Sequence, residues 1–234
     1  MKKLYDRNEV TFAIIWIVIY CVLSVPIRGK YGDESPLMLI ALAAIAIAAT
    51  IFIRRYGLEE KYGLTGWPKD SKIYWFFIPM WILSSGNLWN GFKLSYSGIY
   101  QIMAVMSMLL IGYIEEIIFR GFLFKGMLKR DGVRVSIIVS AVTFGIGHIV
   151  NLLAGQANLQ TVIQVIFAIS WGFIFTMAFY KSGSLIPGII VHGLVDAFSK
   201  FGNLNYTVEM VYMIVTIVTA IIYCTYLAKL PEKA

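Results

Sequence analysis

The sequence predicts an all-α membrane protein with about eight transmembrane helices and both termini in the cytoplasm. Of its 234 residues, 59% are hydrophobic and only 14% are charged, which is more apolar surface than a soluble domain of this size buries. Apolar windows of about 17 to 25 residues, the length that crosses roughly 30 Å of hydrocarbon, recur along the chain. No soluble domain is attached, so we interpret residues 1–234 as a single integral membrane domain.

The predicted spans follow one another with short connections. The first follows Lys2, Lys3 and Arg7 and lacks a small-x-small cleavage site, so we expect a retained helix rather than a signal peptide. Pro79 interrupts the third window and Pro187 the seventh, which makes these two the weakest helices. The eight windows are 10–27, 36–53, 72–90, 99–124, 135–153, 160–181, 184–200 and 207–228.

The 20 Lys and Arg residues set the expected orientation. With the N-terminus in the cytoplasm, fifteen lie in cytoplasmic segments, four lie outside and one lies within a span, as the positive-inside rule requires. The net charge of +7 is scattered between the spans rather than gathered on one strip, so no nucleic-acid partner is expected. The four outer cations are Arg28, Lys30, Lys93 and Lys200, and the intramembrane cation is Arg120.

Three ionisable side chains in the fourth window are the first functional candidates. A charged group at the bilayer centre costs about 2.5 to 3.5 kcal/mol, so Glu115, Glu116 and Arg120 must be paired or hydrated. Glu116 and Arg120 are four residues apart and can pair along one helical face. Glu115 points about 100° away from Glu116, which leaves it freer to act as a base.

The only two histidines, His148 and His192, also lie in apolar windows, and His192 shares a helical face with Asp196. At about 1.5 Å of rise per residue, Glu115, His148 and His192 lie roughly 12 to 20 Å from the cytoplasmic helix ends. We therefore expect one mid-membrane layer, hydrated by a cavity that opens to the cytoplasm. A carboxylate and an imidazole placed together can deprotonate water.

Three short motifs, taken together, resemble one protein family. Over about residues 100–200 the chain resembles the CAAX prenyl endopeptidase and bacteriocin-processing family, also called CPBP or ABI. The motifs are Glu115-Glu116-x-x-x-Arg120, Phe144-x-x-x-His148 and His192-x-x-x-Asp196.

The resemblance implies an eight-helix intramembrane protease that uses a glutamate-activated water. Glu115 and His148 would then activate the water, while His192 and Asp196 would help to stabilise the oxyanion. Eukaryotic-type members carry Asn in place of Asp196, and an ionised carboxylate cannot donate a hydrogen bond, so Asp196 is expected either to contact the oxyanion or to orient His192. The implied catalytic residues are Glu115, Glu116, His148, His192 and Asp196, supported by Arg120 and Phe144.

Two other classes of function stay open at the level of sequence. A family member could serve as a bacteriocin-immunity or scaffold protein, and a small proton-coupled transporter could relay protons through Glu115, His148 and Asp196. No cofactor is expected; a divalent metal, if one binds, would use Glu115, His148 and His192. The expected partners are the lipid bilayer and a peptide or protein substrate, either prenylated or a peptide precursor. The expected location is the plasma membrane of a bacterium or archaeon.

Overall fold

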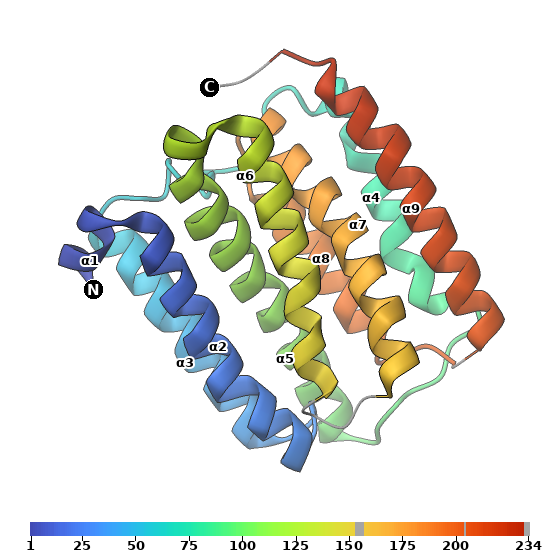
Figure 1. Cartoon of the computed structure of the whole chain (residues 1–234). Coiled ribbons are helices and arrows are strands. Elements are labelled where there is room, and N and C mark those ends of the chain that lie inside the picture. Colours follow the sequence, from blue (N-terminus) through green and yellow to red (C-terminus); the bar gives the residue numbers. More distant parts are fainter. Residues whose placement is uncertain (153–156, 204, 232–234) are drawn as a thin grey trace.

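The computed structural model describes residues 1–152, 157–203 and 205–231, and its regular elements are helices throughout these ranges (Figure 1). The only extended pairing in them is an isolated bridge between Phe92 and Gly202. Residue 153, at the end of the fifth predicted window, and Lys233, one of the predicted cytoplasmic cations, lie outside the described ranges. The predicted all-α class is confirmed.

Side-chain caps fix where three of the long helices begin. Asn8, Ser35 and Asn205 each accept a hydrogen bond from a backbone N–H three residues further on, in the first turn of α2, α3 and α9. The helices are α1 (Lys2–Arg7), α2 (Glu9–Tyr31), α3 (Pro36–Arg55), η1 (Ser71–Phe77), α4 (Ile78–Ser84), η2 (Ser85–Leu88), α5 (Ile99–Glu115), the π-helix η3 (Glu116–Phe124), α6 (Lys125–Gly147), η4 (His148–Leu152), α7 (Asn158–Ser182), α8 (Ile186–Phe198) and α9 (Tyr206–Ala228).

Within the described ranges, five helical segments are long and apolar enough to cross a membrane: Glu9–Tyr31, Pro36–Arg55, Ile99–Leu152, Asn158–Ser182 and Tyr206–Ala228. The third of these covers two predicted windows, because the chain reverses near Gly132. The φ of Gly132 is 77°, a conformation that favours glycine.

The two weakest windows depart from a full-length helix. Residues 72–90 break into η1, α4 and η2, and Trp75, Phe76 and Phe77 at the break have φ of 50°, 50° and 58°. Such left-handed backbone is rare for aromatic residues, and in the sequence only Pro79 indicates a break near this position. Helix α8 is only 13 residues long, about 20 Å at 1.5 Å per residue.

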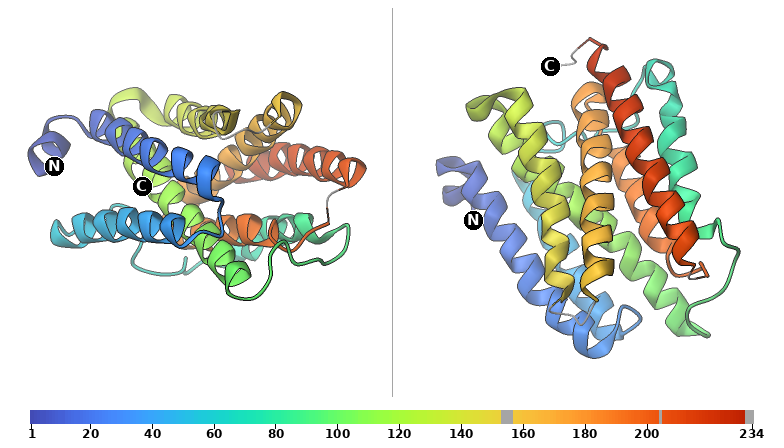
Figure 2. Two further views of the ribbon diagram at one scale, coloured as in Figure 1. Left: turned by 90° about the horizontal axis from the view of Figure 1, so that it is seen from below. Right: turned by 45° about the vertical axis from the view of Figure 1, so that its right-hand side comes forward.

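The bundle has two distinct ends (Figures 1 and 2). At one end, Lys61 contacts Glu9 at the start of α2 and the hydroxyl of Tyr5 in α1. At the other end, about 34 Å along α2 at 1.5 Å per residue, Asp33 binds Lys200 after α8 at 2.8 Å. We call these the α1 end and the Asp33 end.

Close packing of α5 against α8 brings the site residues together. A Cβ on Gly112 of α5 would lie 2.5 Å from the backbone nitrogen of Gly193 in α8, so α5 does not tolerate a larger side chain at this crossing. Glu115 lies one turn beyond Gly112, and His192 directly precedes Gly193. The glycine contact therefore positions a carboxylate opposite an imidazole.

Candidate active site

A buried ion pair forms the floor of the site. Glu116 Oε1 lies 2.9 Å from Arg120 Nη1, and both side chains are fully buried. The guanidinium of Arg120 lies 4.3 Å from the ring centroid of Phe144 and 5.3 Å from that of Phe175, within the range of cation–π attraction. Glu116 and Arg120 thus pair along one face as their spacing predicts, and Phe144 covers the pair.

His192 is held on both edges of its ring. Its Nδ1 lies 2.9 Å from Glu116 Oε1, and its Nε2 lies 3.5 Å from Glu115 Oε2 and 3.6 Å from Asp196 Oδ2. An ionised carboxylate only accepts hydrogen bonds, so the Nδ1–H donates to Glu116. The ring stacks on Phe175 at 5.2 Å, which fixes its plane and aims Nε2 at Glu115 and Asp196.

Glu115 is anchored from a helix outside the three motifs. The hydroxyl of Tyr20 in α2 donates a hydrogen bond to Glu115 Oε1 at 2.7 Å. The other oxygen, Oε2, faces His192. Glu115 is only 8% exposed, so its carboxylate is fixed in direction rather than free to rotate in solvent.

His148 ends α6 and has a defined tautomer. Its Nδ1 lies 3.2 Å from the carbonyl oxygen of Phe144, and because a carbonyl only accepts, Nδ1 carries the proton. A neutral ring in this tautomer has its lone pair on Nε2. His148 also contacts the ring of Phe144 edge to face at 5.3 Å, which links the second motif to the buried ion pair.

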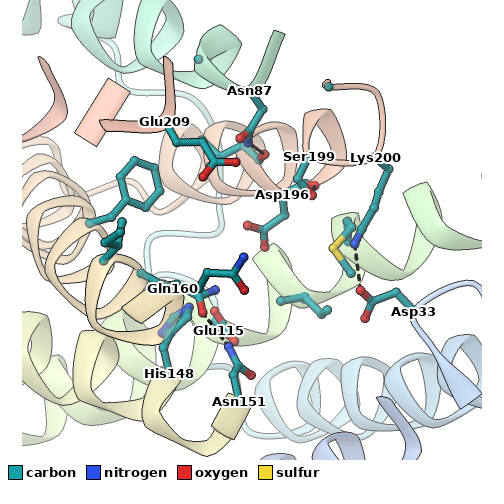
Figure 3. A pocket seen from close by; sticks show the side chains of 18 of the residues that line it. Asp33, Asn87, Glu115, His148, Asn151, Gln160, Asp196, Ser199, Lys200 and Glu209 are labelled. Carbon is teal, nitrogen blue, oxygen red and sulfur yellow. Dashed lines mark hydrogen bonds and ion pairs between the residues drawn. The ribbon is translucent and has the colours of Figure 1, made fainter. Parts of the chain in front are cut away.

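A cavity of about 710 Å³ joins these groups. Glu115, His148 and Asp196 all line it and come from three different helices, as the close view in Figure 3 shows. Tyr20 lines it as well, whereas His192 is not among the lining residues and lies behind Glu115 and Asp196. The structure thus gathers the predicted residues into two layers, a cavity wall and a buried support.

The cavity rim lies at the Asp33 end of the bundle. Exposed residues such as Ser199 and Glu209 line it there (Figure 3), together with Asp33, which binds Arg28 and Lys200 at 2.8 Å each. From the sequence we expect cytoplasmic termini and a cavity that opens to the cytoplasm. These two expectations do not hold together, because the rim and α1 lie at opposite ends of α2.

The charges around Asp33 make a stable ion-pair network at the rim. Burial opposes the ionisation of Asp33, but the charges of Arg28 and Lys200 outweigh it and lower the pKa of the carboxyl below its usual range. Asp33 therefore stays ionised at neutral pH and ties the end of α2 to the segment after α8.

Sequence reasoning missed Tyr20 and the amide side chains in the cavity wall, among them Asn87, Asn151 and Gln160. The chain has 14 tyrosines, and Tyr20 carries no motif of its own. Its only signal is a stripe of buried aromatic residues at four-residue spacing in α2, completed by Phe12 and Trp16. The amides lie near helix ends, where polar residues are common.

Within the described ranges, no group of three or more His, Cys, Asp or Glu side chains is arranged to hold a metal ion. Glu115, His148 and His192, the set that a metal would use, instead contact Tyr20, the Phe144 carbonyl and Glu116. Each of these three side chains therefore has a protein partner.

The long apolar helices and the buried polar site define a multi-pass helical membrane protein with acidic and imidazole groups facing one cavity. Residues 98–198 match the family model described as type II CAAX prenyl endopeptidase Rce1-like. This segment contains all three motifs, and its match to the family model confirms the resemblance drawn from them. No curated protein and no solved structure gives a significant match to the chain.

Proposed function

We propose that the protein is an intramembrane endopeptidase that hydrolyses a peptide bond with a water activated by Glu115 and His148. The family match supports a peptidase in general. The observation that carries the specific proposal is that Glu115, held by Tyr20, lines the same cavity as His148. A carboxylate and a neutral imidazole facing one wet cavity are suited to general-base catalysis.

In the proposed reaction, a water molecule in the cavity attacks the carbonyl carbon of the substrate. Its proton passes to Glu115 while the Nε2 lone pair of His148 holds the water in line. The carbon–nitrogen bond then breaks, and the proton moves from Glu115 to the leaving amine. Water is consumed, and one carboxyl and one amino terminus are released.

His192 is the proposed donor to the developing oxyanion, and Glu116 and Asp196 prepare it for this role. Glu116 accepts from Nδ1, so the opposite edge of the ring, Nε2, faces the carboxylates of the cavity wall. A proton on Nε2 can donate to an oxyanion that approaches between them. Asp196 then orients the imidazole of His192 and favours its protonated form, and it does not contact the oxyanion itself.

The proposed topology has eight crossings with both termini in the cytoplasm of a bacterium or archaeon. The five long apolar segments support six of these crossings, because Ile99–Leu152 covers two of them. In the proposal, the interrupted pair α4 and η2 forms one of the remaining crossings, and the short helix α8 forms the other. The charge asymmetry supports the orientation.

Substitution of Glu115 by Gln tests the proposed chemistry, because it keeps the shape of the side chain and removes the base. Mass spectrometry of membranes should reveal peptides that the wild type cleaves and Glu115→Gln spares, with a rate loss of at least about 100-fold. Glu60→Gln, an identical change at an exposed position, should cleave like the wild type. Full cleavage by Glu115→Gln would refute the role of this residue. Absence of any cleaved peptide in membranes with the wild type, as with Glu115→Gln, would favour an immunity or scaffold protein.

A proton-coupled carrier is the second candidate function. It is favoured by the observation that Glu115, His148 and Asp196 line one cavity. That cavity reaches the Asp33 end, whereas the fully buried Glu116 and Arg120 close the floor beneath it. Proteoliposomes loaded with a pH-sensitive dye distinguish the two functions. A protease should produce no proton flux in this assay. Addition of a chelator is a separate test: cleavage that persists shows that no metal is required, and lost cleavage shows that one is.

A further inference from the structure

We infer that the catalytic cavity is entered from the extracytoplasmic side of the membrane, so that its substrate is an exported polypeptide segment rather than the cytoplasmic end of a prenylated protein. The substrate half of this inference rests on the proposed protease function. The direction of entry rests only on where the charges and the rim lie.

The charges of the two ends differ strongly. Of the described Lys and Arg residues, fourteen belong to the α1 end and four, Arg28, Lys30, Lys93 and Lys200, belong to the Asp33 end. Cations concentrate on the cytoplasmic side of membrane proteins because they resist translocation. The α1 end is therefore cytoplasmic.

The rim is fixed at the opposite end by contacts between distant segments. Asp33, which lines the rim, follows α2 and binds Lys200 beyond α8. Phe92 pairs with Gly202 across the same end, and Lys93 donates its backbone N–H to the carbonyl of Phe201 at 2.7 Å. These contacts hold the mouth of the cavity on the side that carries few cations.

The floor of the cavity blocks entry from the cytoplasmic side. Glu116 and Arg120 are fully buried and paired beneath the cavity wall. The π-helix that carries them continues to Phe124 with every residue buried. A substrate therefore does not reach Glu115 through this part of the protein, and the described rim at the Asp33 end is the mouth that the lining residues mark.

The chemistry of the rim suits an unmodified peptide. Asn90, Asn151, Gln160 and Asn205 line the cavity, and an amide side chain both donates and accepts hydrogen bonds, as a peptide main chain does. The cavity volume of about 710 Å³ lies within the range of ligand pockets and accommodates a short stretch of chain.

Cysteine labelling tests the direction of entry without reference to catalysis. The two free cysteines, Cys21 and Cys224, are first replaced by Ser. A single cysteine is then placed at Ser199, exposed at the rim, or at Thr65, exposed in the connection between α3 and η1 at the α1 end. Both changes replace a small hydroxyl residue, so the two variants are matched.

A membrane-impermeant maleimide should label Ser199→Cys in intact cells and Thr65→Cys only after permeabilisation. The reverse pattern would overturn the inferred direction. If either variant is not inserted, Asn203→Cys and Lys69→Cys, exposed at the same two ends, repeat the comparison.

A second measurement tests the substrate. Peptides from exported precursors are offered to the outer face of right-side-out vesicles and to inverted vesicles. Cleavage should occur only in right-side-out vesicles and should be lost in Glu115→Gln. Cleavage confined to inverted vesicles would overturn the inference. If labelling shows an outward rim but neither vesicle type cleaves any peptide, the protease proposal fails while the direction of entry stands.

Discussion

At the residue scale, the site depends on fixing two carboxylates in different roles through different partners. Glu116 is neutralised by Arg120 and His192, whereas Glu115 receives a neutral hydroxyl from Tyr20 and faces the cavity. In the proposed mechanism, two adjacent acids thus serve as a structural anchor and a reactive group because their surroundings differ.

Loss of the Tyr20 hydroxyl should slow the reaction without unfolding the protein. A hydrogen bond to a charged group contributes about 1.5 to 3 kcal/mol, so Tyr20→Phe should lower kcat by at least about tenfold with KM unchanged. Tyr223→Phe is the control, because Tyr223 donates to the carbonyl of Tyr74 away from the cavity. Both variants should lose similar thermal stability in detergent. Equal kcat values in the two variants would remove Tyr20 from the mechanism.

The buried ion pair predicts a strong non-additive effect on stability. Arg120→Met leaves Glu116 buried without its cation and should destabilise the fold by about 3 to 5 kcal/mol. The double variant with Glu116→Gln should recover much of this loss, since no uncompensated charge remains. Thermal unfolding in detergent measures all four members of the cycle. Additive losses would show that the two groups do not depend on each other.

At the element scale, the close crossing of α5 and α8 determines whether Glu115 meets His192. In Gly112→Ala, the added Cβ would lie 2.5 Å from the Gly193 nitrogen, so the helices must separate and cleavage should fall by more than tenfold. Overpacking of this kind costs about 1 to 3 kcal/mol. Gly121→Ala is the matched change, since its Cβ would meet Tyr62 at an ordinary 3.7 Å. Peptide cleavage and thermal unfolding compare the two variants.

Sequence patterns predicted the long helices and the pairing within single helices, but not contacts between helices. The spacing of Glu116 and Arg120 was enough to predict their ion pair, because four residues bring side chains to one face. Tyr20 lies 95 positions from Glu115, and no local pattern joins them. The break at Trp75–Phe77 was also unpredictable, because its left-handed backbone occurs in residues that rarely adopt it.

At the scale of the whole molecule, Asp33 connects the N-terminal helices to the family core at the cavity rim. Because Arg28 and Lys200 lower the pKa of Asp33, its contribution to stability is present above the unfolded pKa of about 3.9. It is lost as the pH falls through the lower folded value.

Asp33→Asn should therefore be less stable than the wild type at pH 6 by about 1 kcal/mol, typical of a partly exposed ion pair, and this difference should shrink as the pH falls through the lowered pKa of the Asp33 carboxyl. Thermal unfolding in detergent at several pH values measures the difference. Glu60→Gln, at an exposed position in the connection between α3 and η1, controls for the general effect of losing an acidic group. A difference that grows at low pH would contradict the lowered pKa.

The π-helix η3 makes the direction of the two glutamates depend on chain length. A π-helix bonds each N–H five residues back, and such segments are rare outside functional sites. Removing one residue between Glu116 and Phe124 would let the segment close as an ordinary α-helix, which turns about 100° per residue. Helix α5, which precedes the deletion, would then be rotated about its axis relative to α6, which follows it. Glu115 would face lipid or protein instead of the cavity. A single-residue deletion here should thus abolish activity more completely than any one substitution in the segment, even if every other side chain is kept.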